Sequence, residues 1–177
     1  MVPADAPRMT LAELNGMTAG EFARTLGAVF ERSPWVAERA WASRPFASVE
    51  ALHAAMTAVV RRASADERLA LLRAHPDLAG RAARAGTVTA TSAAEQASAG
   101  LDRLGDADYD RFQRLNRAYR VKYGFPFIIA VRQHDVRGIL EAFETRLTRA
   151  PENEMETALG QVFAITRLRL AGLVEPP

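Results

Sequence analysis

Helix-start signals followed by apolar residues at helical spacing run through most of this chain, and they constrain its fold more than any other feature. Thr18 and Glu21 have the spacing of a capping box, in which a hydroxyl side chain begins a helix and a glutamate three residues later bonds back to it. Ser64 and Glu67 repeat the pattern. Apolar side chains then recur every three or four residues, as on the buried face of a helix. The sequence therefore predicts an all-α fold, a single-domain bundle of about seven to nine helices over residues 1–177.

The same signals place the individual helices. Ser33-Pro34 is typical of an N-cap followed by the first helical residue, Ser48 begins another helix, and Gly124 is suited to end one. Residues 80–91 are small and polar without periodicity, which indicates a loop. The expected helices are those starting at Thr18, at Ser33, at Ser48 and at Ser64, and those over about 92–104, 107–123, 136–147 and 155–168.

One stretch, near residues 125–132, breaks the helical pattern. Phe125 to Val131 form a continuous apolar run with no helical period, and Pro126 makes its start non-helical or a helix N-terminus. No partner strand is evident elsewhere, so we expect a buried extended or irregular segment. Its backbone N–H and C=O groups would then lie where only a ligand could satisfy them.

Composition excludes several function classes. The chain has 177 residues, no cysteine and three histidines, so disulfides, thiolate metal sites and cysteine nucleophiles are ruled out, and no His-x-x-x-His pair suggests a metal site. The net charge is +2 despite a pI near 9.5. Basic residues are interleaved with acidic ones, which does not indicate nucleic-acid binding. Glycine-rich phosphate loops and the Gly-x-Ser-x-Gly elbow of serine hydrolases are absent.

Nothing in the sequence directs the protein to a membrane or an organelle. No apolar run approaches the ~20 residues that span a bilayer. The first residues do not resemble a signal peptide, and the last ones do not match the peroxisomal Ser-Lys-Leu signal. We therefore expect a cytoplasmic protein with no membrane partner.

Among the three histidines, His75 is best placed for chemistry. It precedes Pro76, which disfavours helical backbone before it, so His75 is expected at a helix end where it can face a cavity. Its imidazole can gain or lose a proton near neutral pH. The alternative is an ordinary histidine at a helix end. His53 beside an apolar stripe is interpreted as structural, and His134 as solvent-facing.

Two further candidates have equally plain alternatives. Ser92 and Glu95 match a capping box, yet the same helix start could bind an anion, and Gln96 adds an amide that donates and accepts. Arg132 follows the apolar run and could hold a carboxylate bidentately, or be one more surface arginine. Asp77 could face a ligand, but a turn residue that bonds its own backbone fits its position better.

Taken in order, the motifs of this chain resemble those of OHCU decarboxylases, which act on 2-oxo-4-hydroxy-4-carboxy-5-ureidoimidazoline in urate degradation. Each motif alone is weak, but their order and spacing are specific, and together they cover most of the chain. They are His75-Pro76-Asp77-Leu78-Ala79, Ser92-Ala93-Ala94-Glu95-Gln96, Ala99-Gly100-Leu101, Asn116-Arg117-Ala118-Tyr119 and Gly124-Phe125-Pro126-Phe127-Ile128-Ile129, with Phe30 to Trp35, Arg44-Pro45-Phe46 and Arg167 to Leu170 in support.

The resemblance implies an all-helical enzyme without a cofactor or metal that converts OHCU to (S)-allantoin and carbon dioxide. His75 matches the catalytic histidine of the family, and Pro76 and the Ser92 to Gln96 segment match substrate contacts. The backbone of Phe127, Ile128, Ile129, Ala130 and Val131 matches the segment that lines the pocket, with Arg132 at its end. Family members are commonly homodimers. The missing peroxisomal signal points to a bacterial, cytoplasmic member, and the length leaves no room for the hydroxyisourate hydrolase domain to which some members are fused.

On this basis we expect His75 to be the general acid–base residue and proton donor, with Glu95 orienting it or the substrate. Ser92 and Gln96 are expected to bond the ureido group or ring amides, and Arg132 to hold the carboxylate. Two alternatives stay open: a lyase acting on a related ureido or imidazoline compound, and a helical module that binds a ligand without catalysis.

Overall fold

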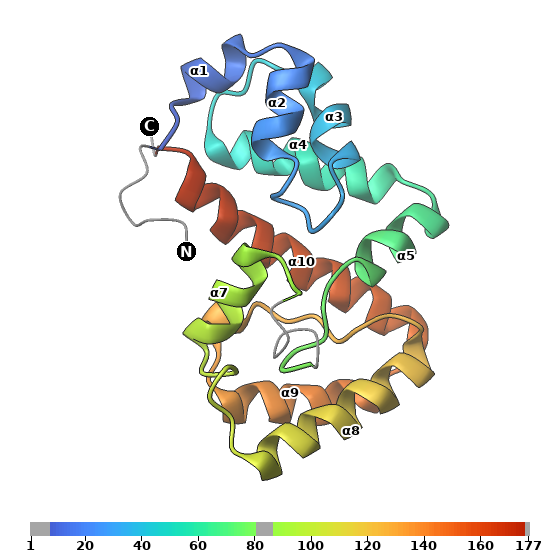
Figure 1. Ribbon diagram of the computed structural model, residues 1–177. Helices are drawn as coiled ribbons and strands as arrows, with labels where there is room; N and C mark the ends of the chain where they lie inside the picture. Colours follow the sequence, from blue (N-terminus) through green and yellow to red (C-terminus); the bar gives the residue numbers. More distant parts are fainter. Residues whose placement is uncertain (1–7, 81–86, 176–177) are drawn as a thin grey trace. The chain divides into compact units, whose positions relative to one another are not determined.

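The computed structural model describes residues 8–80 and 87–175, and over these residues the protein is helical (Figure 1). The prediction of an all-α fold is confirmed: in the described ranges no strand forms, and Met9 and Val174 make one isolated bridge. The helices are α1 (Leu11–Gly16), α2 (Ala19–Leu26), α3 (Trp35–Ala40), α4 (Val49–Arg62), α5 (Ala65–Arg73), α7 (Ala90–Ser98), α8 (Asp106–Tyr123), α9 (Val136–Leu147) and α10 (Pro151–Leu173), with 3-10 turns η1 (Trp41–Ser43) and η2 (Val131–Gln133).

The chain divides into two compact units, each described here by itself. The first, called the 75–162 unit, holds the described residues from His75 to Val162. The second, called the terminal unit, holds the described residues up to Ala74 together with those from Phe163 onward. Every candidate site residue predicted from the sequence lies in the 75–162 unit. Whether residues 1–177 make a single domain, as expected, stays a prediction.

Most helix starts lie where the sequence places them. Thr18 and Ser64 each make a complete capping box, with Glu21 and Glu67 respectively. Ser48 caps α4 by accepting a hydrogen bond from the backbone N–H of Ala51. These caps satisfy N–H groups that have no partner inside the helix, which explains why these residue types mark the boundaries so well.

The start of α3 differs from the prediction by one residue. Pro34, not Ser33, occupies the N-cap position, and it makes no side-chain cap. The hydroxyl of Ser33 is buried and donates to the backbone carbonyl of Glu31, so it is occupied within the preceding turn. Arg32 in that turn has a φ of 46°, a backbone conformation that a local pattern does not predict.

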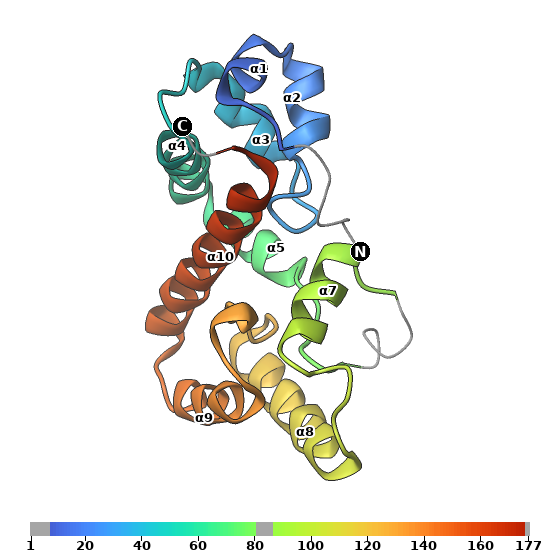
Figure 2. The same cartoon turned by 90° about the vertical axis from the view of Figure 1, so that its left-hand side faces the viewer.

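The terminal unit is built around the packing of α3 against α2 and α4 (Figure 2). Its core contains Phe22, Phe30, Leu52 and Met56, all fully buried. His53 on α4 is half-buried, and its Nε2 lies 3.0 Å from the carbonyl oxygen of Phe163 and 3.1 Å from the hydroxyl of Thr166. These contacts support the structural interpretation of His53.

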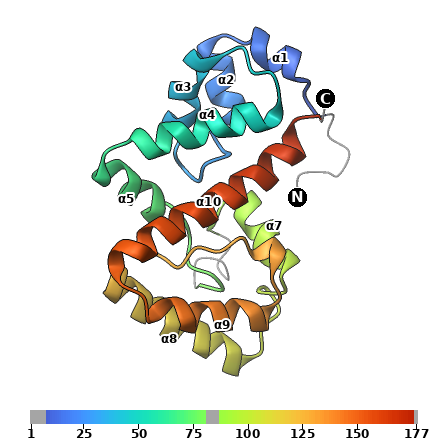
Figure 3. The ribbon, with the colours of Figure 1, turned by 180° about the vertical axis from the view of Figure 1, so that it is seen from behind.

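The 75–162 unit packs α8 against α9 over an aromatic core. The rings of Phe127 and Phe143 stack with centroids 3.9 Å apart, and Tyr119 meets Phe127 edge-on at 5.3 Å. Gly124 ends α8 with a φ of 75°, in the left-handed conformation that favours glycine. The chain then passes through residues 125–131, the 125–131 segment, which is buried and forms no helix before η2, as predicted (Figure 3).

Candidate functional site

His75 lies two residues beyond the end of α5, as the proline after it predicts. Its side chain is 7% exposed, whereas Pro76 is half-buried. Helix α5 therefore delivers a buried imidazole to the start of an irregular turn. That placement withdraws the imidazole from bulk water.

Residues Asp77, Leu78 and Ala79, here called the 77–79 turn, are fastened by the side chain of Gln96. The Oε1 atom of Gln96 accepts a hydrogen bond from the backbone N–H of Ala79 at 2.9 Å, and its Nε2 lies 3.5 Å from the carbonyl oxygen of Asp77. Ala79 has a φ of 48°, which is unfavourable for a residue with a side chain. A Cβ at Gly80 would lie 3.0 Å from the Asp77 Cβ, so a larger residue at this position would crowd the turn.

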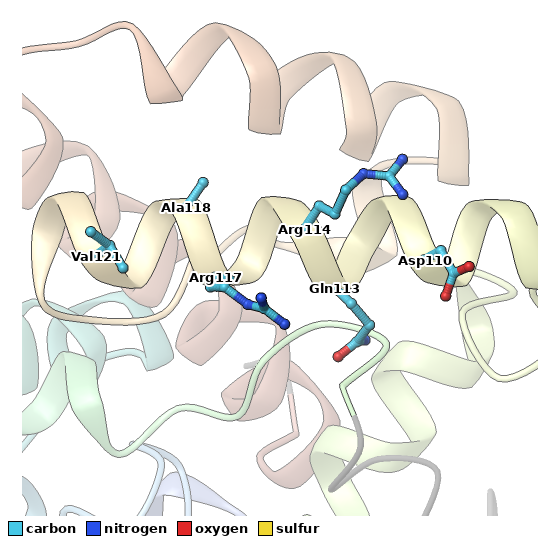
Figure 4. Close-up of a pocket in the computed structure, with 6 residues that line it drawn as sticks. All are labelled: Asp110, Gln113, Arg114, Arg117, Ala118 and Val121. Atoms are coloured by element: carbon cyan, nitrogen blue, oxygen red, sulfur yellow. The ribbon is translucent and has the colours of Figure 1, made fainter.

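Helix α8 holds the same turn from another side. Gln113 Nε2 donates to the carbonyl of Ala79 at 2.9 Å, and Asn116 Nδ2 donates to the carbonyl of Leu78 at 2.9 Å. Figure 4 shows Gln113 pointing from α8 toward this turn. Arg120 Nε bonds the carboxylate of Asp77 at 2.8 Å, so Asp77 is engaged by another helix and is not a simple turn residue that bonds its own backbone.

The capping-box interpretation of Ser92 and Glu95 is wrong. Helix α7 begins at Ala90, and its N-cap is Thr89, whose hydroxyl accepts a hydrogen bond from the backbone N–H of Ser92. The run Thr89 to Ser92 offers several residues able to cap, and the earliest one is used. Ser92 and Glu95 therefore lie inside the helix, Ser92 and Gln96 buried and Glu95 half-buried. Of the predicted 80–91 loop, residues 81–86 lie outside the described ranges.

Four backbone groups of the 125–131 segment are satisfied by the protein itself; two of them, the carbonyls of Ala130 and Val131, accept from the backbone N–H groups of Gln133 and His134 at 2.9 and 3.1 Å. The Nη1 atom of Arg146 donates to the carbonyl of Ile128 at 2.6 Å, and the backbone N–H of Ala130 donates to Oε1 of Gln161 at 2.9 Å. The expectation that only a ligand could bond this backbone is therefore wrong for these four groups. Ile129 is 4% exposed and Phe127 is fully buried, and within the described ranges the N–H and C=O groups of both have no hydrogen-bond partner. These backbone groups are thus among the ones in the segment that could pair with a ligand.

A buried ionic network supports this segment, and sequence reasoning missed it. The Arg146 Nε donates to the Glu154 carboxylate at 2.7 Å, and the hydroxyl of Tyr119 donates to the same oxygen. The guanidinium of Arg146 also lies 4.4 Å from the centre of the Phe127 ring. Burial, and then the bond to Glu154, raises the pKa of Tyr119 well above its ordinary value, so its hydroxyl stays protonated. One signal was available: Arg146 continues the apolar stripe of Ile139 and Phe143 on α9.

Helix α7 links the parts of the candidate site. Through Gln96 it contacts the 77–79 turn, and it also packs against η2, which contains Val131 and Arg132. The buried Val131 is followed by Arg132, whose side chain is exposed. The structure therefore brings the Ser92 to Gln96 helix next to both the turn after His75 and the end of the 125–131 segment.

A shallow groove elsewhere on the 75–162 unit contains none of the predicted site residues. It runs along α8 and is lined by Asp110, Gln113, Arg114, Arg117, Ala118 and Val121 (Figure 4). In residues 8–80 and 87–175 no group of three or more histidine and acidic side chains is gathered to hold a metal ion. None of the described helices is long and apolar enough to cross a membrane.

Comparison with known proteins decides the family. The family model described as OHCU decarboxylase matches residues 15–171. The chain belongs to the OHCU decarboxylase family. A 2-oxo-4-hydroxy-4-carboxy-5-ureidoimidazoline decarboxylase of Halalkalicoccus jeotgali is 46% identical over 169 residues, covering 96% of this chain and 94% of the relative. The resemblance noted in the sequence motifs is thereby confirmed.

Two crystal structures of other proteins have a similar fold. An (S)-allantoin synthase superposes with a TM-score of 0.74 at 35% identity over 94% of this chain, which spans about half, 54%, of the synthase chain. An OHCU decarboxylase studied in the presence of (S)-allantoin gives a TM-score of 0.66 at 26% identity, covering 82% of this chain and 94% of the other.

Proposed function

We propose that this protein is a decarboxylase of urate degradation that converts OHCU to (S)-allantoin and carbon dioxide. The observation that carries the proposal is the OHCU decarboxylase match across residues 15–171, which includes every candidate site residue. The solved relatives support the product, because one is an (S)-allantoin synthase and another was crystallised with (S)-allantoin.

The reaction breaks the carbon–carbon bond to the carboxylate and leaves its electron pair on the ring system. Carbon dioxide departs, and the electron pair is held by the adjacent carbonyl and imine groups until a proton reaches the carbon. In the proposed mechanism the imidazolium of His75 delivers this proton to one face of the ring, which yields a single enantiomer. Burial of His75 helps, because a proton donor shielded from water transfers its proton only to the bound intermediate.

Glu95 is proposed to orient His75 or the substrate hydroxyl. The structure removes the competing explanation, since Thr89 caps α7 and Glu95 lies within the helix. Glu95 is half-buried, so its carboxylate is partly withdrawn from water. A carboxylate near an imidazole favours the protonated form, which is the form that donates.

The remaining candidates are proposed to bind the substrate. Ser92 and Gln96, both buried, hydrogen-bond the ureido group or the ring amides; Gln96 still has one N–H and one lone pair beyond its bonds to the 77–79 turn. The backbone of Phe127 to Val131 pairs with the ring edge, and the apolar side chains exclude water. Pro76 forms a wall beside His75. Arg132, exposed next to α7, binds the substrate carboxylate through its guanidinium, and this interaction weakens as the carboxylate becomes carbon dioxide.

The proposal is tested by adding the purified protein to freshly generated OHCU and following the decay and the circular dichroism of the product. We expect faster decay and one-handed allantoin, and we expect His75→Asn to abolish both while remaining folded. Saturable binding without faster decay would show a ligand-binding module instead. Faster turnover of another ureido compound than of OHCU would show a related lyase.

A cytoplasmic homodimer is also predicted. Light scattering tests the oligomeric state, and cell fractionation tests the localisation.

A further inference from the structure

One face of α8 fastens the three residues that follow His75-Pro76. Gln113, Asn116 and Arg120 are spaced three and four residues apart, which places them in one row on the helix. In that order they bond the carbonyl of Ala79, the carbonyl of Leu78 and the carboxylate of Asp77, at 2.9, 2.9 and 2.8 Å. The row and the turn run in opposite directions, and each turn residue has one partner on α8.

These bonds hold a turn that is not part of any helix. The backbones of Leu78 and Ala79 are buried, so their carbonyls need partners from side chains. Ala79 keeps an unfavourable φ of 48°, which persists only where the surroundings enforce it. Gln96 binds the N–H of Ala79 from the α7 side, so the turn is clamped between two helices.

This clamp, formed by Gln113, Asn116 and Arg120 on α8 and by Gln96 on α7, also restricts the position of His75. Pro76 joins the turn to His75, and its ring permits little rotation about its own φ. A turn held at Asp77, Leu78 and Ala79 therefore limits where the backbone of His75 can lie. Side chains that stand on α8 are better suited to this than loop residues, because a long helix is rigid.

We propose that Gln113 and Asn116 are positioning residues for His75, acting through the 77–79 turn and not by contact with the substrate. The inference rests on the proposed function, since it assumes that His75 delivers the proton. This role explains why α8 presents two amide side chains to the turn: they can donate hydrogen bonds to its carbonyls, which apolar side chains could not. It also assigns a role to the Asn116 of the Asn-Arg-Ala-Tyr motif.

The test uses near-isosteric substitutions that remove the amide donor, Gln113→Met and Asn116→Leu, in the full-length protein. Arg114→Met is the matched control, because Arg114 lies on the same helix, is exposed and is not bonded to the turn. Kinetic constants with OHCU and the urea unfolding midpoint are measured for each. The imidazole proton signals of His75 are followed by NMR against pH; three histidines make assignment direct, since one signal is missing from His75→Asn.

We expect kcat to fall about tenfold to a hundredfold in Gln113→Met, the range that follows from an ångström-scale displacement of a reacting group, with KM within about twofold. The His75 signal should shift or broaden and titrate with a different midpoint, whereas Arg114→Met should match the parent in every measurement. If Asn116→Leu does not fold, Gln113→Met alone decides, because Gln113 is only half-buried.

The outcomes separate the two proposals. If His75→Asn is inactive while Gln113→Met keeps the parent kcat and the parent His75 titration, the clamp is overturned and the proposed function stands. A raised KM with an unchanged kcat and an unchanged His75 signal also overturns the clamp, because it indicates a binding role. If His75→Asn keeps full activity, the catalytic role of His75 is overturned and the clamp's part in catalysis with it.

Discussion

At the scale of single residues, the position of Glu95 within α7 separates catalysis from helix capping. We expect Glu95→Gln to lower kcat about tenfold to a hundredfold, because the neutral amide no longer favours the protonated imidazole. Its free energy of unfolding should stay near that of the parent, because the capping bond of α7 is made by Thr89. Steady-state kinetics and urea denaturation measure the two effects.

The matched control is Thr89→Ala, which removes the real cap of this helix. It should lower the free energy of unfolding by about 1 kcal/mol and keep the kcat of the folded protein. Parent activity in Glu95→Gln would contradict the proposed role of the carboxylate.

A second prediction at the scale of single residues concerns how His53 makes the free energy of unfolding depend on pH. Burial first, with a smaller effect of Arg167, lowers the pKa of His53 below its ordinary 6.5 in the folded protein, although its bond to Phe163 acts the other way. Because the carbonyl of Phe163 can only accept, Nε2 carries the proton of the neutral ring. The unfolded chain then binds a proton more readily than the folded one, so this group's contribution to stability is complete above pH 6.5 and is lost as the pH falls below it.

We therefore expect His53→Gln to reduce the decline in unfolding free energy between neutral and acidic pH. Urea unfolding at a series of pH values measures the slope. His134→Gln, a change at an exposed histidine of the other unit, should leave the slope as in the parent. An identical slope in the parent and His53→Gln would refute the assignment.

At the scale of elements, what could be predicted depended on whether the signal was local. The starts of α2, α4 and α5 were predicted from residues that bond their own helix, and the end of α8 from Gly124. The start of α7 was misplaced because Thr89 and Ser92 carry the same capping chemistry. The bonds from Gln113 and Asn116 to the 77–79 turn were not predicted, because they join residues more than thirty positions apart that no periodicity connects.

The element-scale prediction concerns the network beneath the 125–131 segment. Arg146→Met would leave the fully buried Glu154 without its guanidinium partner and the carbonyl of Ile128 without a donor. Removing one member of a buried pair typically costs about 3–5 kcal/mol of unfolding free energy. Arg137→Met on the same helix breaks an exposed pair with Glu141 and should cause no measurable change. Equal urea midpoints for the two variants would contradict the structural role of Arg146.

At the scale of the whole molecule, one family model spans residues 15–171 and so includes parts of both compact units. The candidate site, by contrast, could be assembled from the 75–162 unit alone. The family was evident from the sequence because its motifs are short, ordered and local. The geometry that joins them was not, because it depends on helix packing such as that of α7 against η2.

The chemistry of the substrate supports a last prediction, that the reaction needs no metal. The electron pair left by the departing carboxylate can be held by the carbonyl and imine groups of the ring itself, so the protein has to supply only a proton and a fixed orientation. Dialysis against a strong chelator should therefore leave kcat and KM for OHCU unchanged, and added divalent ions should not raise them. The His75→Asn variant, assayed in parallel, sets the background decay. Activity lost on chelation and restored by one metal ion would assign that ion a part in the reaction and reduce the role proposed for His75.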